Sequence, residues 1–138
     1  NKIVDFHLKN LHKADIVIPG IKVSYNSPNS IIRILSARDG KIMYMSRSKV
    51  PSNFNNKLTF IDKHASIISF QQKALNKYSK FKKSFYEKNE DIELLRAIEN
   101  GMNVYSFSFI DAAFSVDLYD DYLKAKIAMT KDIYRKKY

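Results

Sequence analysis

The sequence predicts an α/β fold in which a mixed sheet is flanked by helices. Segments with helical spacing of apolar residues alternate along the chain with short runs of β-branched and aromatic residues. This alternation is typical of helices packed on a mixed sheet. The chain has 138 residues, of which 45% are hydrophobic, enough for one globular core. We therefore expect residues 1–138 to form a single domain.

The first part of the chain predicts a helix followed by a strand. Apolar side chains over 2–13 gather mostly on one side of a helix. The apolar run 16–18 suits a buried strand, which Pro19 and Gly20 are expected to interrupt. Alternating apolar residues predict that extended structure resumes over 21–25.

The clearest local signal is a β-hairpin. Apolar segments over 31–37 and 41–47 flank the turn Arg38-Asp39-Gly40, and Asp-Gly supplies the positive φ that a tight hairpin needs. Residues 48–61 show no clear period and contain Pro51 and several asparagines. They predict a long connection between regular elements.

The second half predicts strands and helices in alternation. β-branched and aromatic residues over 65–70 favour an interior strand, and helical spacing follows over 71–84. A helix over 89–101 has an asparagine N-cap and a glycine stop. A strand over 104–109 and a last helix over about 118–135 complete the order.

Composition excludes several classes of protein. The chain has no cysteine, which excludes disulfides, thiolate metal sites and a cysteine nucleophile, and a cytoplasmic location is expected. No apolar run approaches the roughly 18 to 20 residues that cross a bilayer, so no membrane span is expected. The net charge of +10 fits an anionic partner. Nucleic acid is disfavoured because no aromatic-basic pattern of the RNA-recognition type occurs, and the lysines of 73–83 are interpreted as a solvated helix face.

Four stretches of the sequence together form a recognisable pattern. They are Asp39-Gly40 with Tyr44 to Pro51, Lys63 to Phe70, Glu90 to Arg96, and Ser115-Val116-Asp117. In this order and at these distances they resemble the C-terminal half of the 3-deoxy-manno-octulosonate cytidylyltransferase family and its acylneuraminate relatives. The resemblance implies a partial nucleotide-diphospho-sugar transferase (Rossmann-like) fold. It also implies that the chain is the sugar-binding and dimerisation half, without the N-terminal nucleotide-binding half.

The resemblance gives Arg47 a catalytic and substrate-binding role. In the family a strand ends in Ser-Arg followed shortly by Pro, as Ser46, Arg47 and Pro51 are arranged here, and the arginine lies beside the anionic ligands. A guanidinium at a strand end can hold a carboxylate or phosphate through paired hydrogen bonds. The alternative is a hairpin-edge arginine exposed to water.

His64 and Glu93 are implied to bind the sugar acid. His64 matches a family histidine that opens a strand, although the family's following Gly-Ile-Tyr is Ser66-Ile67-Ile68 here. Glu93 and Arg96 match a Glu-x-x-Arg pattern on a helix, in which the glutamate faces the sugar and the arginine braces the helix. The alternatives are a polar residue at a strand boundary for His64 and the solvated side of a helix for Glu93.

Asp117 is implied to be a catalytic residue and a metal ligand. It matches the aspartate of the family's Val-Asp motif, which holds magnesium together with a second aspartate from the N-terminal half. Magnesium takes hard oxygen ligands, usually one or two carboxylates plus phosphate oxygens. The alternative is that Asp117 caps the following helix, whose first turn contains Asp120 and Asp121.

The implied activity is transfer of cytidine monophosphate from CTP to a sugar acid such as 3-deoxy-manno-octulosonate, for bacterial lipopolysaccharide synthesis. Mg²⁺ is the implied cofactor, CTP and the sugar acid are the implied partners, and a homodimer is expected. The family's CTP-binding motifs, a Pro-Ala-Arg stretch and a Gly-Asp-Glu-Pro-like loop, do not occur in this sequence. The chain alone is therefore expected to be inactive. Two alternatives stay open: an acylneuraminate-type cytidylyltransferase, and a non-catalytic basic binding module.

Overall fold

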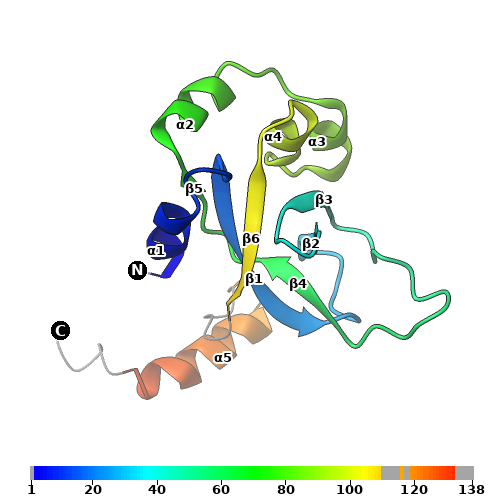
Figure 1. Ribbon diagram of the computed structural model, residues 1–138. Helices are drawn as coiled ribbons and strands as arrows, with labels where there is room; N and C mark the ends of the chain where they lie inside the picture. The colour runs from blue at the N-terminus through cyan, green and yellow to red at the C-terminus, as the bar shows by residue number, and fades with distance from the viewer. Residues whose placement is uncertain (1, 110–115, 117–118, 133–138) are drawn as a thin grey trace.

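The computed structural model describes residues 2–109, 116 and 119–132. The strands are β1 (Ile16–Ser24), β2 (Arg33–Ser36), β3 (Ile42–Ser46), β4 (Phe60–His64), β5 (Ser69–Phe70) and β6 (Val104–Phe109). The helices are α1 (Lys2–Lys9), α2 (Gln72–Tyr78), α3 (Phe85–Glu90), α4 (Leu95–Glu99) and α5 (Tyr119–Thr130). The strand order is β3-β2-β4-β1-β5, and β6 pairs with β1. The β1–β6 pair is parallel and the other pairs are antiparallel. The predicted mixed sheet flanked by helices is confirmed (Figure 1).

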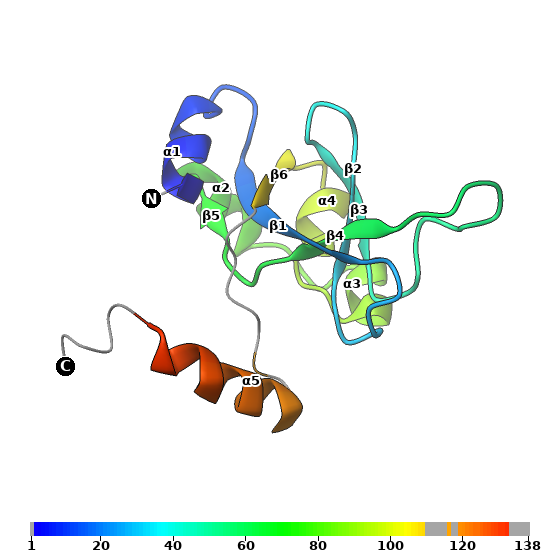
Figure 2. The same cartoon turned by 90° about the horizontal axis from the view of Figure 1, so that it is seen from below.

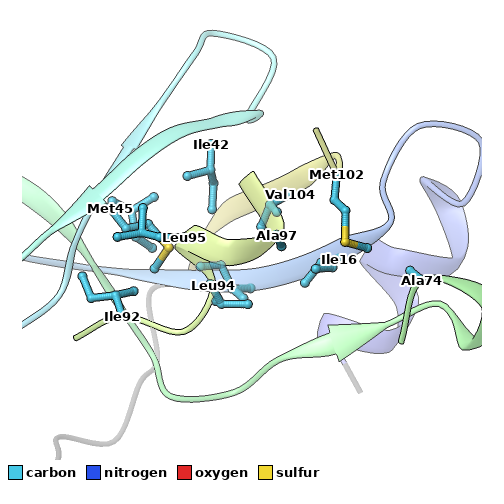
Figure 3. Close-up of a cluster of buried hydrophobic side chains, with 12 residues drawn as sticks. Ile16, Ile42, Met45, Ala74, Ile92, Leu94, Leu95, Ala97, Met102 and Val104 are labelled. Atoms are coloured by element: carbon cyan, nitrogen blue, oxygen red, sulfur yellow. The ribbon is translucent and has the colours of Figure 1, made fainter. Parts of the chain in front are cut away.

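Strand β1 forms the centre of the fold because it is buried on both faces. Ile16 and Ile18 belong to one hydrophobic cluster and Val17 to another, as the alternation of side chains along a strand requires. In the larger cluster, side chains of α4 meet those of β1 and β3 (Figure 3). The smaller cluster lies under α1, where Phe6 stacks on Phe107 with ring centroids 4.5 Å apart. Burial on both faces explains the unbroken apolar run at the start of β1.

The prediction that Pro19 and Gly20 interrupt this strand is wrong, because β1 continues through both. The N–H and C=O of a strand residue point to the same side, and the Pro19 carbonyl accepts a hydrogen bond from the amide of Ala65 (3.2 Å). The missing N–H of Pro19 therefore lies on the side of β1 that pairs first with β5 and then with β4, at the point where the partner changes. Gly20 fits because a Cβ there would lie only 3.1 Å from the Cβ of Asp62.

The predicted hairpin is confirmed, since β2 and β3 pair antiparallel across the turn that contains Gly40. Gly40 has a φ of 88°. A Cβ at this position would lie 2.7 Å from the carbonyl oxygen of Ser106, whose amide donates to the Gly40 carbonyl (2.8 Å). The turn is thus pressed against β6, and glycine meets both the conformational and the steric requirement.

The strand predicted over 65–70 is wrong for most of its length. The strand that pairs with β1 and β2 is β4, which begins inside the connection predicted over 48–61. Ser66 follows β4 with a φ of 57°, a left-handed conformation that a strand cannot contain. Only the short β5 belongs to the predicted segment.

The single helix predicted over 89–101 is divided into α3 and α4. Ser84 and Glu87 form a capping box that starts α3, so Asn89 lies inside a helix instead of capping one. Asp91 then adopts a left-handed conformation (φ 53°) and ends α3. The division directs the apolar residues that follow Asp91 into the larger cluster.

The remaining predictions concern element ends. Helix α1 ends before the predicted residue 13, and α2 ends at Tyr78 although helical spacing continues to 84. Gly101 (φ 73°) follows α4, as predicted for the glycine stop. The predicted strand over 104–109 is confirmed by β6, and the last helix is confirmed by α5, which ends at Thr130, before the predicted residue 135. None of the helices in the described ranges combines the length and the apolar character needed to cross a membrane.

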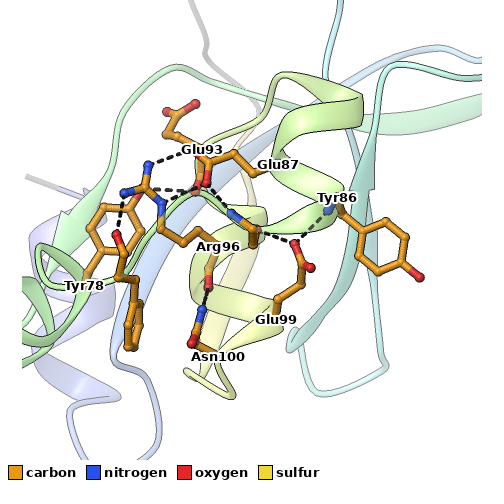
Figure 4. Close-up of polar contacts among 9 residues, drawn as sticks. Tyr78, Tyr86, Glu87, Glu93, Arg96, Glu99 and Asn100 are labelled. Atoms are coloured by element: carbon orange, nitrogen blue, oxygen red, sulfur yellow. Dashed lines mark hydrogen bonds and ion pairs between the residues drawn. The ribbon is translucent and has the colours of Figure 1, made fainter.

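Arg96 joins α4 to α3 and to the segment between α2 and α3 (Figure 4). Its Nη2 and Nε donate to the two carboxylate oxygens of Glu87 (2.6 and 2.8 Å), and its Nη1 donates to the Phe81 carbonyl (3.1 Å). The guanidinium also lies 5.0 Å from the centroid of the Tyr78 ring. Its hydrogen bonds lower the pKa of Glu87, and Glu87 raises the pKa of Arg96. The predicted bracing role of Arg96 is confirmed.

Arg96→Met should lower the free energy of unfolding at neutral pH by about 2–3 kcal/mol, because a nearly buried carboxylate loses its charged donors. The pKa of Glu87 lies below its ordinary value of 4.5, so this stabilisation is complete above pH 4.5 and is lost as the pH falls through the lowered pKa. Urea unfolding at neutral and strongly acidic pH measures both effects. Lys88→Met, at an exposed position of α3 next to Glu87, is the control. A loss that does not depend on pH would contradict this account.

Candidate functional site

A cavity of about 380 Å³ lies where the loop before β2, the end of β3 and the end of β4 meet. It is lined by Ser30, Ile31, Ile32, Arg47, Lys63, His64 and Ser66. The fold therefore brings together Arg47 and His64, which the sequence proposed as parts of one site. Two strand ends and a loop form the cavity, which is a common position for binding sites because loops leave the sheet there.

The side chain of Arg47 is held in place by main-chain oxygens. Its Nε donates to the carbonyl of Glu90 (2.9 Å), Nη1 to that of Ser30 (3.1 Å) and Nη2 to that of Asp91 (3.1 Å). These acceptors are neutral, so they fix the guanidinium without cancelling its charge. A guanidinium has five N–H donors, which leaves two for a ligand. Arg47 is half-buried and bonded on three sides, which favours a fixed side chain over the alternative of a freely exposed hairpin-edge arginine.

Glu90 attaches the end of α3 to the end of β3. Its Oε1 accepts hydrogen bonds from the Ser46 hydroxyl (2.7 Å) and the Tyr44 hydroxyl (3.4 Å), and its Oε2 accepts one from the amide of Arg47 (2.9 Å). Burial and the nearby charge of Glu90 raise the pKa of Tyr44. The sequence offered a signal for this contact: Tyr44 and Ser46 are two apart in a strand, so their side chains share a face and their hydroxyls can reach one acceptor.

Arg33 supports the site from inside the sheet and was missed by the sequence analysis. Its side chain is fully buried, and its Nη1 donates to the carbonyl of Arg47 (2.8 Å) while Nη2 donates to the carbonyl of Ser27 (2.5 Å). Arg33 thereby fixes both the main chain at Arg47 and the loop that lines the cavity. An arginine within the apolar segment 31–37 was the available signal, because a buried charge needs partners that can hydrogen-bond it.

The ring of His64 lies at the wall of the cavity. Its Nε2 is buried and has no hydrogen-bond partner among the described residues. Burial lowers the pKa of His64, and the negative charge of Glu93 offsets only part of this effect, so the ring is neutral at pH 7. The ammonium-bearing Lys63 also lines the cavity and was not singled out from the sequence. The cavity thus combines two cations with a neutral imidazole and two serines, a combination suited to an anionic ligand that carries hydroxyl groups.

Glu93 is not among the residues that line this cavity. It is exposed, and its carbonyl accepts a hydrogen bond from the Tyr78 hydroxyl (3.0 Å), while its side chain points away from the Arg96 network (Figure 4). The negative charge of Glu93 acts on His64 through space and raises the pKa of its ring, against the larger effect of burial. The arrangement fits a surface position beside the cavity, and the predicted contact of Glu93 with the sugar acid stays a prediction.

Asp117 lies outside the described residues, so its roles as metal ligand or helix cap stay predictions. Asp120 and Asp121 lie in the first turn of α5, as expected. No group of three or more His, Cys, Asp and Glu side chains able to hold a metal ion occurs in the described ranges.

The sequence matches a known family over most of its length. A family model described as Cytidylyltransferase matches residues 6–104. The 3-deoxy-manno-octulosonate cytidylyltransferases of Rickettsia felis and Rickettsia typhi are each 36% identical to this chain over 126 residues. These matches cover 90% of this chain and 49% and 50% of the two relatives. The chain therefore spans about half the length of the curated relatives it matches.

A solved structure shows the same fold. It is described as CMP:2-keto-3-deoxy-manno-octonic acid synthetase complexed with CTP, and it matches with a TM-score of 0.84 at 20% sequence identity. The match covers 94% of this chain and 54% of that chain. The predicted partial nucleotide-diphospho-sugar transferase fold is confirmed by this likeness. With the family model matching well over half of its residues, the chain belongs to the cytidylyltransferase family.

Proposed function

We propose that this chain supplies the sugar-acid-binding part of a cytidylyltransferase, which transfers cytidine monophosphate from CTP to an eight-carbon sugar acid such as 3-deoxy-manno-octulosonate. The observation that carries the proposal is the cavity in which the Arg47 guanidinium, held only by neutral carbonyls, lies near Lys63 and His64. The relatives named for this reaction support the choice of substrate. The whole reaction requires the half of the relatives that this chain does not match.

Each cavity residue has a chemical part in this proposal. The two free N–H groups of Arg47 and the ammonium of Lys63 bind the carboxylate of the sugar acid. The neutral His64 ring and the serine hydroxyls line the part of the cavity that receives the sugar hydroxyls. Together they orient the sugar so that one of its hydroxyls attacks the α-phosphorus of CTP and pyrophosphate leaves. Their contribution is therefore positioning.

We also propose that Asp117 is a magnesium ligand, because Val116-Asp117 matches the family's Val-Asp motif and this ion prefers carboxylate and phosphate oxygens. The ion would neutralise charge on the phosphates and orient the displacement. Asp117→Asn should then abolish Mg²⁺-dependent CTP binding once both halves are present, while binding of the sugar acid to the cavity is unchanged. If Asp117 only caps a helix, the substitution would lower stability without separating CTP binding from sugar-acid binding.

The biological setting follows from the proposed reaction. Sugar acids of this kind are incorporated into bacterial lipopolysaccharide, and CTP is a cytoplasmic metabolite, so we propose a cytoplasmic enzyme of surface-polysaccharide synthesis. The homodimer expected from the resemblance stays a prediction. The acylneuraminate-type alternative differs by the length of the sugar acid. Measuring the binding of eight-carbon and nine-carbon acids to the chain distinguishes the two. If the cavity does not bind sugar acids, the result would favour the alternative of a non-catalytic basic binding module.

The first test is direct binding of 3-deoxy-manno-octulosonate to the chain, measured by calorimetry or by NMR shifts. Lys63→Met should weaken binding about tenfold or more, because a charge-assisted contact of about 1.5–3 kcal/mol is lost. Arg47→Met should weaken it at least as much, although its structural bonds make a stability measurement necessary beside it. Lys49→Met, an exposed residue that does not line the cavity, is the matched control. Equal affinity of all variants would contradict the proposal.

The second test is the titration of His64, followed by NMR of its ring protons. Its pKa in the free chain should lie below 6.5, the ordinary value, and should rise when the sugar acid binds because the carboxylate favours the protonated ring. Since the unfolded chain takes up this proton first, the contribution of His64 to stability is complete above pH 6.5 and falls as the pH decreases through the lowered pKa. The exposed His12 serves as the internal control. A pKa that does not respond to the sugar acid would place the ligand elsewhere.

The third test concerns turnover. The chain alone should form no cytidine monophosphate sugar from CTP and the sugar acid, because the reaction needs groups from both halves. Product formation is expected when the unmatched half of the Rickettsia felis relative is added. Robust CTP-dependent product formation by the chain on its own would overturn the view that it supplies one half of the activity.

A further inference from the structure

Ser66 lies where the chain passes from β4 to β5, two strands that pair with the same side of β1 (Figure 2). The register pairs Gly20 with His64 and Val17 with Ser69. Four residues between β4 and β5 therefore lie opposite only two residues of β1, so this segment must bulge. Ser66 forms part of the bulge with a φ of 57°. Glycine is the residue that adopts such a left-handed conformation without steric cost.

The side chain of Ser66 has a steric cost that no polar contact within the fold offsets. A left-handed φ brings the Cβ of any residue except glycine too close to the backbone. Ser66 is exposed, and its hydroxyl makes no hydrogen bond within the described part of the chain. Glycine would therefore serve the bulge at least as well as serine. Strained backbone conformations of this kind cluster at binding sites, where the side chain has a use outside the fold.

The cavity gives the Ser66 side chain such a use. Ser66 lines the cavity together with Arg47, Lys63 and His64. The two cations suit the carboxylate of a sugar acid, which leaves the neutral groups for the rest of the ligand. A hydroxyl donates one hydrogen bond and accepts two, so it can pair with a sugar hydroxyl in either direction. The bulge thus keeps a hydroxyl at the cavity wall that has no other partner among the described residues.

We infer that Ser66 is a specificity-determining residue whose hydroxyl binds a hydroxyl group of the sugar acid. This inference rests on the proposed function, because it takes the cavity as the sugar-acid site. A site that hydrogen-bonds a ligand hydroxyl discriminates against acids that lack it. The charges of Arg47 and Lys63 attract any carboxylate, whereas Ser66 contributes to the choice among carboxylic acids.

The test compares two substitutions of Ser66 that change affinity and stability in different ways. Ser66→Gly removes the hydroxyl, so binding of 3-deoxy-manno-octulosonate should weaken about three- to tenfold, as expected for one neutral hydrogen bond. Its melting temperature should not fall, because relief of the strained φ offsets the greater freedom of the unfolded chain. Ser66→Thr keeps the hydroxyl and should change the affinity less than about twofold, although a branched Cβ at positive φ lowers the melting temperature. Ser52→Gly, at an exposed serine outside the cavity, is the matched control and should leave the affinity unchanged.

A second ligand tests which part of the acid Ser66 contacts. Pyruvate is a 2-keto acid without sugar hydroxyls, and NMR shifts follow its binding at millimolar concentration. Ser66→Gly should leave pyruvate binding unchanged, whereas Lys63→Met should weaken the binding of both acids. An equal loss for pyruvate and for the sugar acid would assign the Ser66 hydroxyl to the carboxylate and would overturn the inference.

The outcomes also separate this inference from the proposed function. If Lys63→Met weakens binding of the sugar acid and Ser66→Gly does not, the proposed function stands and the inference alone fails. If Ser66→Gly and Ser66→Thr weaken binding equally, the shape of the bulge and not the hydroxyl is responsible, and the inference also fails. If the unsubstituted chain does not bind the sugar acid, the proposed function fails and the inference fails with it.

Discussion

The junction of Arg33, Arg47 and Glu90 is the interaction on which the candidate site depends. Arg33 holds the carbonyl of Arg47, the Arg47 side chain holds the carbonyl of Glu90, and the Glu90 carboxylate holds the amide of Arg47. These contacts link β2, β3 and α3, and each involves a charged donor or acceptor, which makes it stronger than a neutral hydrogen bond. The end of β3 therefore cannot shift relative to α3 without breaking several such bonds together.

The same junction sets the electrostatic character of the cavity. Arg33 is buried and Arg47 is half-buried, and the acceptors of both side chains are carbonyl oxygens. A carbonyl satisfies the hydrogen bond but leaves the positive charge, so both side chains and Lys63 contribute positive potential at the cavity. An anion entering the cavity meets groups that are already oriented, and little further ordering is required of the protein. This preorganisation is the physical reason to regard the cavity as a binding site.

The sequence predicted the elements whose signals are local. The Asp39-Gly40 turn, the apolar strand β6 and the juxtaposition of Arg47 with His64 needed only turn chemistry, alternation or a family pattern. Prediction from the sequence failed where tertiary contacts decide which residues form a strand. Strand β4 is half-buried and polar, so it lacks the apolar alternation of a strand, and Pro19 stays in β1 only because the partner strand changes there.

The supporting residues of the site were also beyond the sequence analysis. The apolar segment around Arg33 signals a buried position, but the partners of Arg33 come from a loop and the end of another strand, which its own segment does not identify. The capping box of Ser84 and Glu87 was a readable signal that the stronger-looking Asn89 obscured. What could be predicted was that Arg47 and His64 meet at the cavity. What could not be predicted was how they are held, because that depends on main-chain oxygens.

The central position of β1 has a consequence for how the chain reaches its fold. The Asp15 carboxylate, one residue before β1, accepts a hydrogen bond from the amide of Asn103, 88 positions along the chain (2.7 Å). Strand β1 and the hairpin leave the ribosome long before β6 does, and until then one edge of a strongly apolar strand has no partner. Long-range pairing of this kind is slow, and an open strand edge invites contact with other chains. The nascent polypeptide thus exposes an open edge of β1 until β6 has been synthesised.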